Sequence, residues 1–245
     1  QTVSALSGTG SAVALNGGAA LTVNQSSDTS YAGSLTGTGS LTKSGNGTLV
    51  LSGSNSYGGG TTVSDGTLQG TTSSLQGNIT NNASVVFDQA TVGTYAGSMT
   101  GSGTLTVGGG GTVVLTGSNS FTGGTTITAG SLLQIGNGGT SGSLSGNVLN
   151  DGTLAFFRSD TITFAGDISG TGGLLFMGGT TVTLTGNNSF TGGIALSGGT
   201  IVVGADSELG GAGSTLTLAG STLQATASFT SSRNIVLAGT GGTFV

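Results

Sequence analysis

The amino-acid sequence predicts an all-β fold in which short strands stack as a parallel β-solenoid. Three observations lead to this prediction. The chain repeats itself, its apolar residues fall in runs of three to five separated by Gly, Asn, Ser and Asp, and nowhere do apolar residues follow a helical period over ten or more positions. We therefore expect almost no helix.

The repeat is long and occurs three times. A block that begins at Tyr31 recurs from Tyr95 and from Phe164, so the second interval is longer than the first. The five extra residues of the second interval fall between Leu132 and Leu144, where a surface loop can absorb them. No linker rich in Pro or charge divides the chain. We expect a single β-helix segment over residues 1–245, with repeat blocks near 31–94, 95–163 and 164–203 and divergent coils over 204–245.

Comparison of the copies predicts which side chains face the core. The run Leu49-Val50-Leu51 recurs as Val113-Val114-Leu115 and as Val182-Thr183-Leu184. The outer two positions stay apolar and the middle one drifts, as in a strand with one buried face. The same comparison predicts further inward positions: Leu35, Met99 and Ile168; Leu41, Leu105 and Leu174; Val63, Ile127 and Leu196.

Strands this short cannot bury an apolar face alone, so each coil must cover the next. The absence of Pro fits this stacking, because Pro would remove a ladder hydrogen bond from an interior strand. The 53 glycines suit tight corners. A coil of about 20 residues gives roughly 12 coils, a rod of roughly 55 to 60 Å and about three coils per copy.

Composition excludes several partners. Eleven of the 245 residues carry a formal charge, and the net charge is −5. Three cations cannot build the basic surface that holds nucleic acid or an anionic membrane, and no apolar run is long enough to insert into a membrane. Without Cys and His, disulfides, thiol nucleophiles and most metal chemistry are excluded, and we expect no cofactor.

The sequence starts at Gln1 without a signal peptide, so we expect a segment of a longer protein.

The repeat resembles a known family. The pattern G-x-G-x-L-x-K-x-G-x-G-T-L-x-L-x-G-x-N-x-Y-x-G-G-T, which runs from Gly37 to Thr61, is similar to the passenger-associated repeat of bacterial autotransporters. The later copies depart from it where Val107 and Phe176 replace Lys43, Phe121 and Phe190 replace Tyr57, and Ile194 replaces Thr61. The tail from Ser231 to Val245 resembles the segment that opens a further repeat in this family.

This resemblance implies a single-stranded right-handed parallel β-helix, exported through a C-terminal translocator barrel of the parent chain and found at the bacterial cell surface or outside the cell. The expected function is a non-catalytic stalk or scaffold segment of an autotransporter adhesin. As an alternative, the lateral face binds a host glycan or matrix protein. Self-association through the open ends of the solenoid is a further expectation.

A remote alternative is a polysaccharide hydrolase or lyase that uses carboxylates. The group Asp151, Arg158, Asp160 and Asp167 is the candidate, because residues about one coil apart can lie side by side. Asp167, however, aligns with Ser98 and Ser34, which indicates a tolerant exposed corner. We interpret these residues as solvated turn carboxylates and predict no catalytic residue.

Two other motifs have simple structural interpretations. Asp206 and Glu208 would share a face if extended and could bind a hard cation such as Ca²⁺, but the nearby GGAGS string lacks the Asp of a Ca²⁺-binding repeat. We interpret them as surface acids and predict no metal site. Strings such as Gly37-Thr38-Gly39 lack the context of a phosphate-binding loop, and their recurrence predicts coil corners.

Asn55, Asn119 and Asn188 recur just before the aromatic residues Tyr57, Phe121 and Phe190. Asn tolerates left-handed turns and bonds to its own backbone, while the aromatic ring fills a gap over a corner. The alternative is a row of rings that stacks on a glycan. Equivalent rings would lie about three coils, or roughly 14 Å, apart, which is wide for neighbouring sugars. We favour packing.

The threonines suggest a last alternative function, that of a template. Regular rows of outward Thr on a flat solenoid face can template ice or a crystalline polysaccharide. Such a face needs one Thr-x-Thr motif per coil, and the motif is irregular here, as in Thr61-Thr62, Thr125-Thr126 and Thr181-Val182-Thr183. We interpret the threonines by their high strand propensity in solvated positions.

Overall fold

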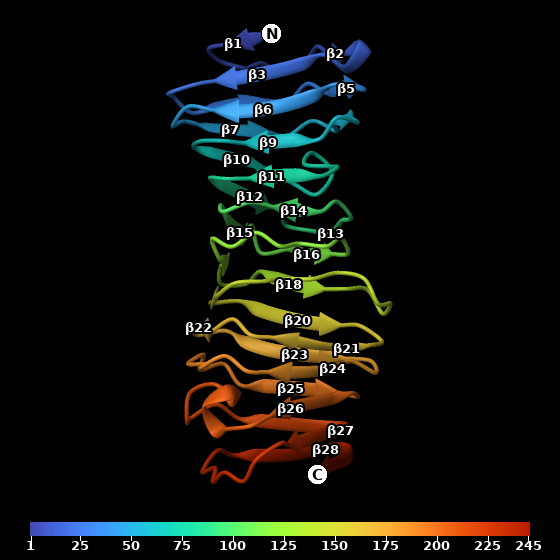
Figure 1. The fold of residues 1–245 in the computed structure, drawn as a ribbon, viewed down its shortest axis with the longest axis vertical. Helices are drawn as coiled ribbons and strands as arrows, with labels where there is room; N and C mark the ends of the chain where they lie inside the picture. The colour runs from blue at the N-terminus through green and yellow to red at the C-terminus, as the bar shows by residue number, and fades with distance from the viewer.

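The computed structural model describes residues 1–245 as one elongated solenoid (Figure 1). Every strand pairing is parallel, and the strands lie across the long axis of the rod. The helical content is limited to two 3₁₀ segments, η1 (Asn16–Gly18) and η2 (Asp206–Leu209). The predicted all-β solenoid is confirmed. No helix is long and apolar enough to cross a membrane.

The strands form four sheets. The six-stranded sheet contains β1 (Thr2–Val3), β3 (Ala20–Asn24), β6 (Ser40–Ser44), β9 (Thr61–Val63), β11 (Ile79–Asn81) and β14 (Met99–Thr100). The three-stranded sheet contains β2 (Val13–Leu15), β5 (Leu35–Gly37) and β8 (Ser56–Tyr57). The eight-stranded sheet contains β4 (Thr29–Tyr31), β7 (Thr48–Leu51), β10 (Thr67–Gly70), β12 (Ser84–Asp88), β15 (Thr104–Gly108), β17 (Thr125–Ile127), β19 (Val148–Asn150) and β22 (Ile168–Ser169).

The eleven-stranded sheet contains β13 (Val92–Tyr95), β16 (Thr112–Leu115), β18 (Leu132–Ile135), β20 (Thr153–Phe157), β21 (Thr161–Phe164), β23 (Gly173–Met177), β24 (Thr181–Leu184), β25 (Ile194–Ser197), β26 (Thr200–Val203), β27 (Leu216–Ala225) and β28 (Ile235–Phe244). It bends around a corner of the rod, because the long strand β27 pairs with β25 at its start and with β26 at its end.

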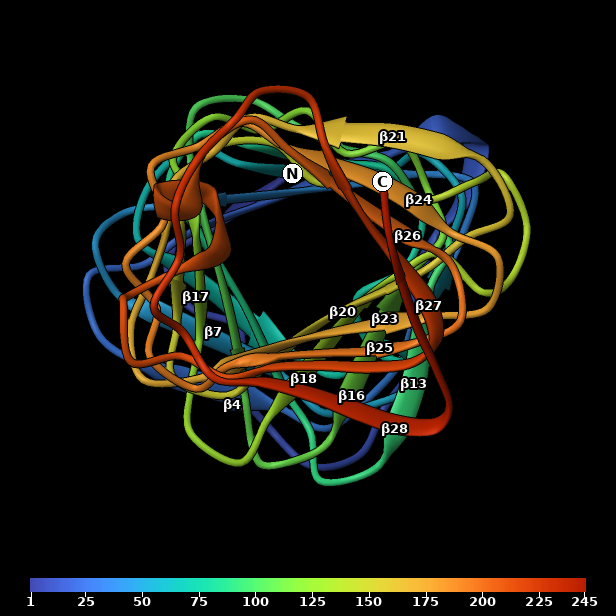
Figure 2. The same ribbon diagram turned by 90° about the horizontal axis from the view of Figure 1, so that it is seen from below.

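Consecutive strands lie on different sides of the rod, which we call its walls. The strands β3, β4 and β5 follow one another in the chain and belong to three different sheets. Viewed along the axis, β7 and β17 lie on one side, β18, β23 and β25 on a second, and β21 and β24 on a third (Figure 2). Each wall therefore collects strands from successive coils, and each strand pairs with the strand one coil away.

The coil varies in length along the rod. Residues paired in a ladder lie one coil apart, and the interval is shortest from Thr67 to Ser84 and longest from Thr125 to Val148. The long coil contains segment 136–147, which joins β18 to β19 outside any strand and takes up the residues that lengthen the second sequence interval. Differences in coil length are therefore absorbed mostly in the connections, and the ladders stay in register except between β27 and β28, where the register shifts between Ala219 and Ser221.

One sequence repeat is longer than the three coils expected. Three coils after Leu41 the ladder of the six-stranded sheet reaches Met99, and the repeat equivalent of Leu41, Leu105, follows on the next strand. One repeat therefore spans three complete coils and continues to the next strand, which lies on another side of the rod. Its equivalent residues change sheet with each copy, since Leu105 is in the eight-stranded and Leu174 in the eleven-stranded sheet.

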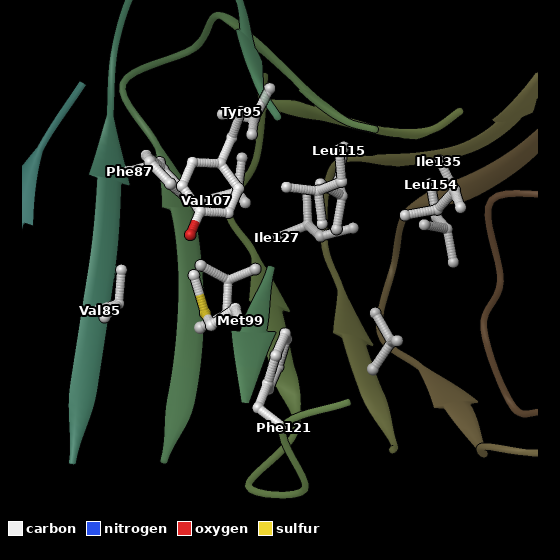
Figure 3. Packing of buried hydrophobic residues seen from close by; sticks show 14 of the residues in the cluster. Val85, Phe87, Tyr95, Met99, Val107, Leu115, Phe121, Ile127, Ile135 and Leu154 are labelled. Atoms are coloured by element: carbon white, nitrogen blue, oxygen red, sulfur yellow. The ribbon is translucent and has the colours of Figure 1, made fainter. Parts of the chain in front are cut away.

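A single apolar core runs through the rod and contains 43 buried residues. Figure 3 shows Phe87 of β12, Met99 of β14, Leu115 of β16 and Leu154 of β20 pointing into it. The predicted inward positions are confirmed, since all are at most 2% exposed. Val114 differs from expectation. It lies on the outer row with Thr94 and Gln134, yet it is only 5% exposed.

Glycine is required at the corners. Gly37, Gly101 and Gly170 are equivalent in the three copies and adopt φ values of 102°, 108° and 103°. A side chain on Gly101 would also collide with the carbonyl oxygen of Asn81 in the previous coil. The predicted corner role is confirmed.

Candidate functional surface

The strongest candidate for catalysis, the group around Asp160, forms structural contacts. The Arg158 guanidinium is buried and binds Asp160 through Nε–Oδ1 at 2.8 Å and Nη2–Oδ2 at 2.6 Å. It also donates hydrogen bonds to the carbonyl oxygens of Thr140 and Gly142 in segment 136–147. The hydrogen bonds from Arg158 lower the pKa of the Asp160 carboxyl. Arg158, held in place by Asp160, thus joins segment 136–147 to the rod through these carbonyl oxygens.

Asp151 and Asp167 are not stacked on each other as the one-coil interpretation required. Asp151 Oδ1 accepts hydrogen bonds from the amide and hydroxyl of Thr171, both at 3.0 Å. Asp167 Oδ1 accepts a hydrogen bond from the Asn187 amide at 2.7 Å. Each partner lies one coil ahead, so both carboxylates link neighbouring coils at exposed corners. The residue that bonds to Asp167 from the previous coil is Asn147 and not Asp151.

Asp206 and Glu208 are not extended, because both lie in η2, so they do not share a strand face. Asp206 Oδ1 accepts a hydrogen bond from Nε of Arg233 at 2.8 Å, and Glu208 Oε2 accepts one from the Gly204 amide at 2.6 Å. The buried Arg233 lowers the pKa of the Asp206 carboxyl by hydrogen bonding. No group of three or more potential metal-ligating side chains occurs in the structure.

The three equivalent Asn residues join neighbouring coils, and Asn119 Nδ2 also donates a hydrogen bond to the Gly117 carbonyl oxygen of its own turn at 3.0 Å. Oδ1 of Asn55 accepts a hydrogen bond from the Leu35 amide at 2.7 Å, and its Nδ2 donates to the Ser74 carbonyl at 2.7 Å. Asn119 and Asn188 bridge coils in the same way. No residue other than Gly has a positive φ, so the expected left-handed Asn turn is wrong. A buried amide that satisfies backbone groups of two neighbouring coils explains the position.

The equivalent aromatic residues lie inside the rod. Tyr57, Phe121 and Phe190 are at most 4% exposed, so they cannot form a row that stacks on glycans. Packing, the favoured interpretation, is confirmed. The Tyr57 hydroxyl lies 2.6 Å from Thr61 Oγ1, and burial raises the pKa of the Tyr57 phenol.

Lys43 is fully buried, which the sequence analysis did not anticipate. Its Nζ donates hydrogen bonds to the carbonyl oxygens of Ser44, Gly45 and Asp65, at 3.1, 2.7 and 3.1 Å. Burial lowers the pKa of the ammonium group. The equivalent residues Val107 and Phe176 are also inward, which indicates that Lys43 replaces an apolar core residue and points its charged end at a corner.

Threonines form a regular column on the outside of the six-stranded sheet. Successive register partners on β1, β3, β6, β9, β11 and β14 are Thr2, Thr22, Thr42, Thr62, Thr80 and Thr100. We call these six residues the Thr column. Each member is exposed or half-buried. The sequence analysis missed this column because it compared repeats. The constant interval from Thr2 to Thr22, Thr42 and Thr62, which is one coil, reveals its first four members.

The outer row of the eleven-stranded sheet is different. Its register partners include Val114, Gln134, Ala155, Leu175 and Ala195. The walls of the rod therefore differ in chemistry although the sequence repeat is uniform. Because equivalent residues change wall with each copy, alignment of the repeats does not show this difference.

The repeats match a family model. The passenger-associated-transport-repeat model matches residues 41–69, 105–133 and 177–203. The adhesin BmaC autotransporter of Brucella suis biovar 1 (strain 1330) is 46% identical over 99 residues, which cover 39% of this chain. These two findings support an autotransporter passenger domain with repeats.

The three matches begin on β6, β15 and β23, on three different sheets of the passenger segment. In this chain each copy of the repeat is therefore displaced by one wall of the rod from the copy before it. Passenger domains of autotransporters are displayed on the cell surface or secreted. The match to the Brucella suis adhesin spans 3% of that protein's length. No solved structure matches the chain.

Proposed function

We propose that this passenger segment is a non-catalytic stalk of an autotransporter adhesin, and that the parent chain supplies a C-terminal translocator. The observation that carries the proposal is the continuous apolar core of 43 residues beneath unbroken parallel ladders. Such a core resists bending, because every coil is held by hydrogen bonds to both neighbours. The likeness to an autotransporter adhesin supports the same role.

The charged residues support a structural role as well. Arg158 and Arg233 are buried and paired with Asp160 and Asp206. Asp151 and Asp167 hold amide groups of the next coil. A general acid or base needs a carboxylate that is free to exchange a proton with a substrate in a cleft. Here the candidate carboxylates are instead used to hold the rod together.

A deletion that preserves the register tests the stalk. Leu41 and Met99 occupy the same inward column of the six-stranded sheet, three coils apart. Removal of residues 41–98 should join Ser40 to Met99 without disturbing the ladder and shorten the rod by about 14 Å. Small-angle scattering should show a shorter rod of unchanged cross-section. A collapsed or broadened particle would contradict the proposal.

Enzyme activity is tested separately. Wild type, Asp160→Asn and Asp167→Asn should give the same background release of reducing sugar or unsaturated product from polysaccharide substrates. Turnover by the wild type that either substitution abolishes would replace the stalk by the polysaccharide hydrolase or lyase alternative.

A further inference from the structure

The Thr column has free hydroxyl groups. None of the side-chain oxygens of its six members takes part in a hydrogen bond within the protein. Other polar side chains near the corners are engaged, such as Asn78, whose Oδ1 accepts a hydrogen bond from the Ser98 amide at 3.0 Å. Each column hydroxyl can therefore both donate and accept a hydrogen bond with an external partner.

The neighbouring outward positions are uncharged and mostly polar, with the exposed Ala20 beside Thr22 as an exception. Ser40 and Ser44 flank Thr42, and Asn78 and Asn82 flank Thr80. No Lys, Arg, Asp or Glu side chain faces outward on the strands of this sheet, since Lys43, the one charged residue among them, is buried. The wall thus attracts neither anionic nor cationic polymers by charge.

The outward residues of this sheet form a repeating grid. Neighbouring coils are about 4.8 Å apart, and outward residues on one strand are about 6.6 Å apart. Six coils extend the column over about 24 Å. A ligand that uses the whole grid must itself be extended and periodic along the rod axis, because a compact ligand would reach only one or two coils.

We propose that the Thr column binds an extended neutral polysaccharide that lies along the rod. Sugar hydroxyls match the donors and acceptors of Thr, Ser and Asn, and the Thr methyl groups can contact the C–H faces of sugar rings. Each hydrogen bond contributes little in water, so affinity depends on many contacts repeated along both polymers. This binding role goes beyond that of a stalk and does not depend on it.

A second column repeats the arrangement further along the chain. Register partners on β21, β24, β26, β27 and β28 are Thr161, Thr181, Thr200, Thr222 and Thr243. On the first two strands Thr163 and Thr183 add a parallel row. The Thr-x-Thr motif is therefore aligned on β21 and β24, and each of the other three strands adds one Thr to the column.

The test is retention of the purified segment on microcrystalline cellulose, insoluble chitin and insoluble β-glucan, with alginate as the charged comparison. The column variant carries Thr42→Val, Thr62→Val and Thr80→Val and, so that the second column cannot bind in its place, Thr181→Val, Thr200→Val and Thr222→Val. Val keeps the β-branched shape and the strand propensity and removes the hydroxyl. The matched control carries Thr67→Val, Thr106→Val and Thr126→Val, three half-buried outward positions on the eight-stranded sheet.

We expect wild type to bind at least one neutral polysaccharide, with little dependence on salt. The column variant should bind at least tenfold more weakly, and the control should bind as wild type does. Thr→Ser at the same column positions should keep binding, and circular dichroism and melting temperature verify that each variant folds. Absence of binding to every neutral polysaccharide, equal binding by the column variant, or salt-sensitive binding to alginate alone would overturn the proposal. Inhibition of ice growth without polysaccharide retention would assign the column to ordered water and overturn it too.

Discussion

The hydroxyl of Tyr57 lies 2.6 Å from Oγ1 of Thr61 in the interior of the rod, and neither later copy keeps this pair. In the second copy the equivalent residues are Phe121 and Thr125, and Thr125 Oγ1 is buried without a hydrogen-bond partner. In the third copy Phe190 stands with Ile194, and both members are apolar. The first copy pairs two polar groups and the third copy has none, so neither leaves a buried polar atom without a partner. The second copy leaves one unpaired.

Restoring the pair in the second copy should stabilise the rod. Phe121→Tyr gives Thr125 Oγ1 a partner, and we expect the free energy of unfolding to rise by about 0.5–1.5 kcal/mol. The control is Phe190→Tyr, whose new hydroxyl would meet Ile194 and should lower the free energy of unfolding by about 1–3 kcal/mol. Denaturant unfolding of the two variants measures the difference. Equal effects of the two substitutions would contradict the pairing.

The bridging amides should also be essential for stability. Oδ1 of Asn119 accepts a hydrogen bond from the Met99 amide at 2.9 Å, and Nδ2 donates to the Ser143 carbonyl at 3.0 Å. Asn119→Ala should cost about 1–3 kcal/mol for each buried backbone group that it leaves unpaired. Asn46→Ala, at an exposed position without a side-chain hydrogen bond, should change stability by less than about 0.5 kcal/mol. Thermal denaturation compares them, and a neutral Asn119 variant would rule out the bridge.

The core was predictable because it depends on local alternation alone. Leu49 and Leu51 keep their apolar class in every copy, and the structure buries both. The register between coils was not predictable in the same way. It depends on the length of each coil, which differs along the rod, whereas comparison of copies reveals only the length of a repeat that exceeds three coils. The Thr column and the change of wall with each copy both follow from that register.

The roles of the polar residues were also hidden, for a different physical reason. Lys43 and Arg158 are long side chains whose buried ends reach carbonyl oxygens at corners. Residue type alone favours a solvated position for such side chains. Only the position of the corner carbonyls, which depends on the fold, makes burial favourable. Asn55 is similar, since its partners belong to the coils before and after it.

Stability should fall in acid through the two Arg–Asp pairs. Arg158 and Arg233 hold the pKa values of Asp160 and Asp206 below their ordinary value of 3.8. Between the folded and unfolded pKa values the unfolded chain binds more protons, so this stabilisation is complete above about pH 4 and declines as the pH falls through the folded pKa. Melting temperatures between pH 2 and 7 should show the decline. Asp160→Asn should weaken it, and an unchanged pH profile in that variant would exclude a contribution from this pair.

The inward orientation of the core gives the most severe test. Leu115 is fully buried, and its register partners Tyr95 and Ile135 are also core residues (Figure 3). Leu115→Ala should cost about 2–5 kcal/mol through lost contacts and a cavity. Leu115→Asp should cost still more, because a carboxylate there has no partner and no water.

The neighbouring residue provides the control for this series. Thr116 follows β16 and is half-buried, so Thr116→Asp keeps its carboxylate in contact with water and should change stability by less than about 0.5 kcal/mol. Chemical denaturation should therefore rank wild type and Thr116→Asp together, then Leu115→Ala, then Leu115→Asp. If both Asp variants melted at the same temperature, Leu115 would not face the interior and the strand alternation on which the solenoid depends would be wrong.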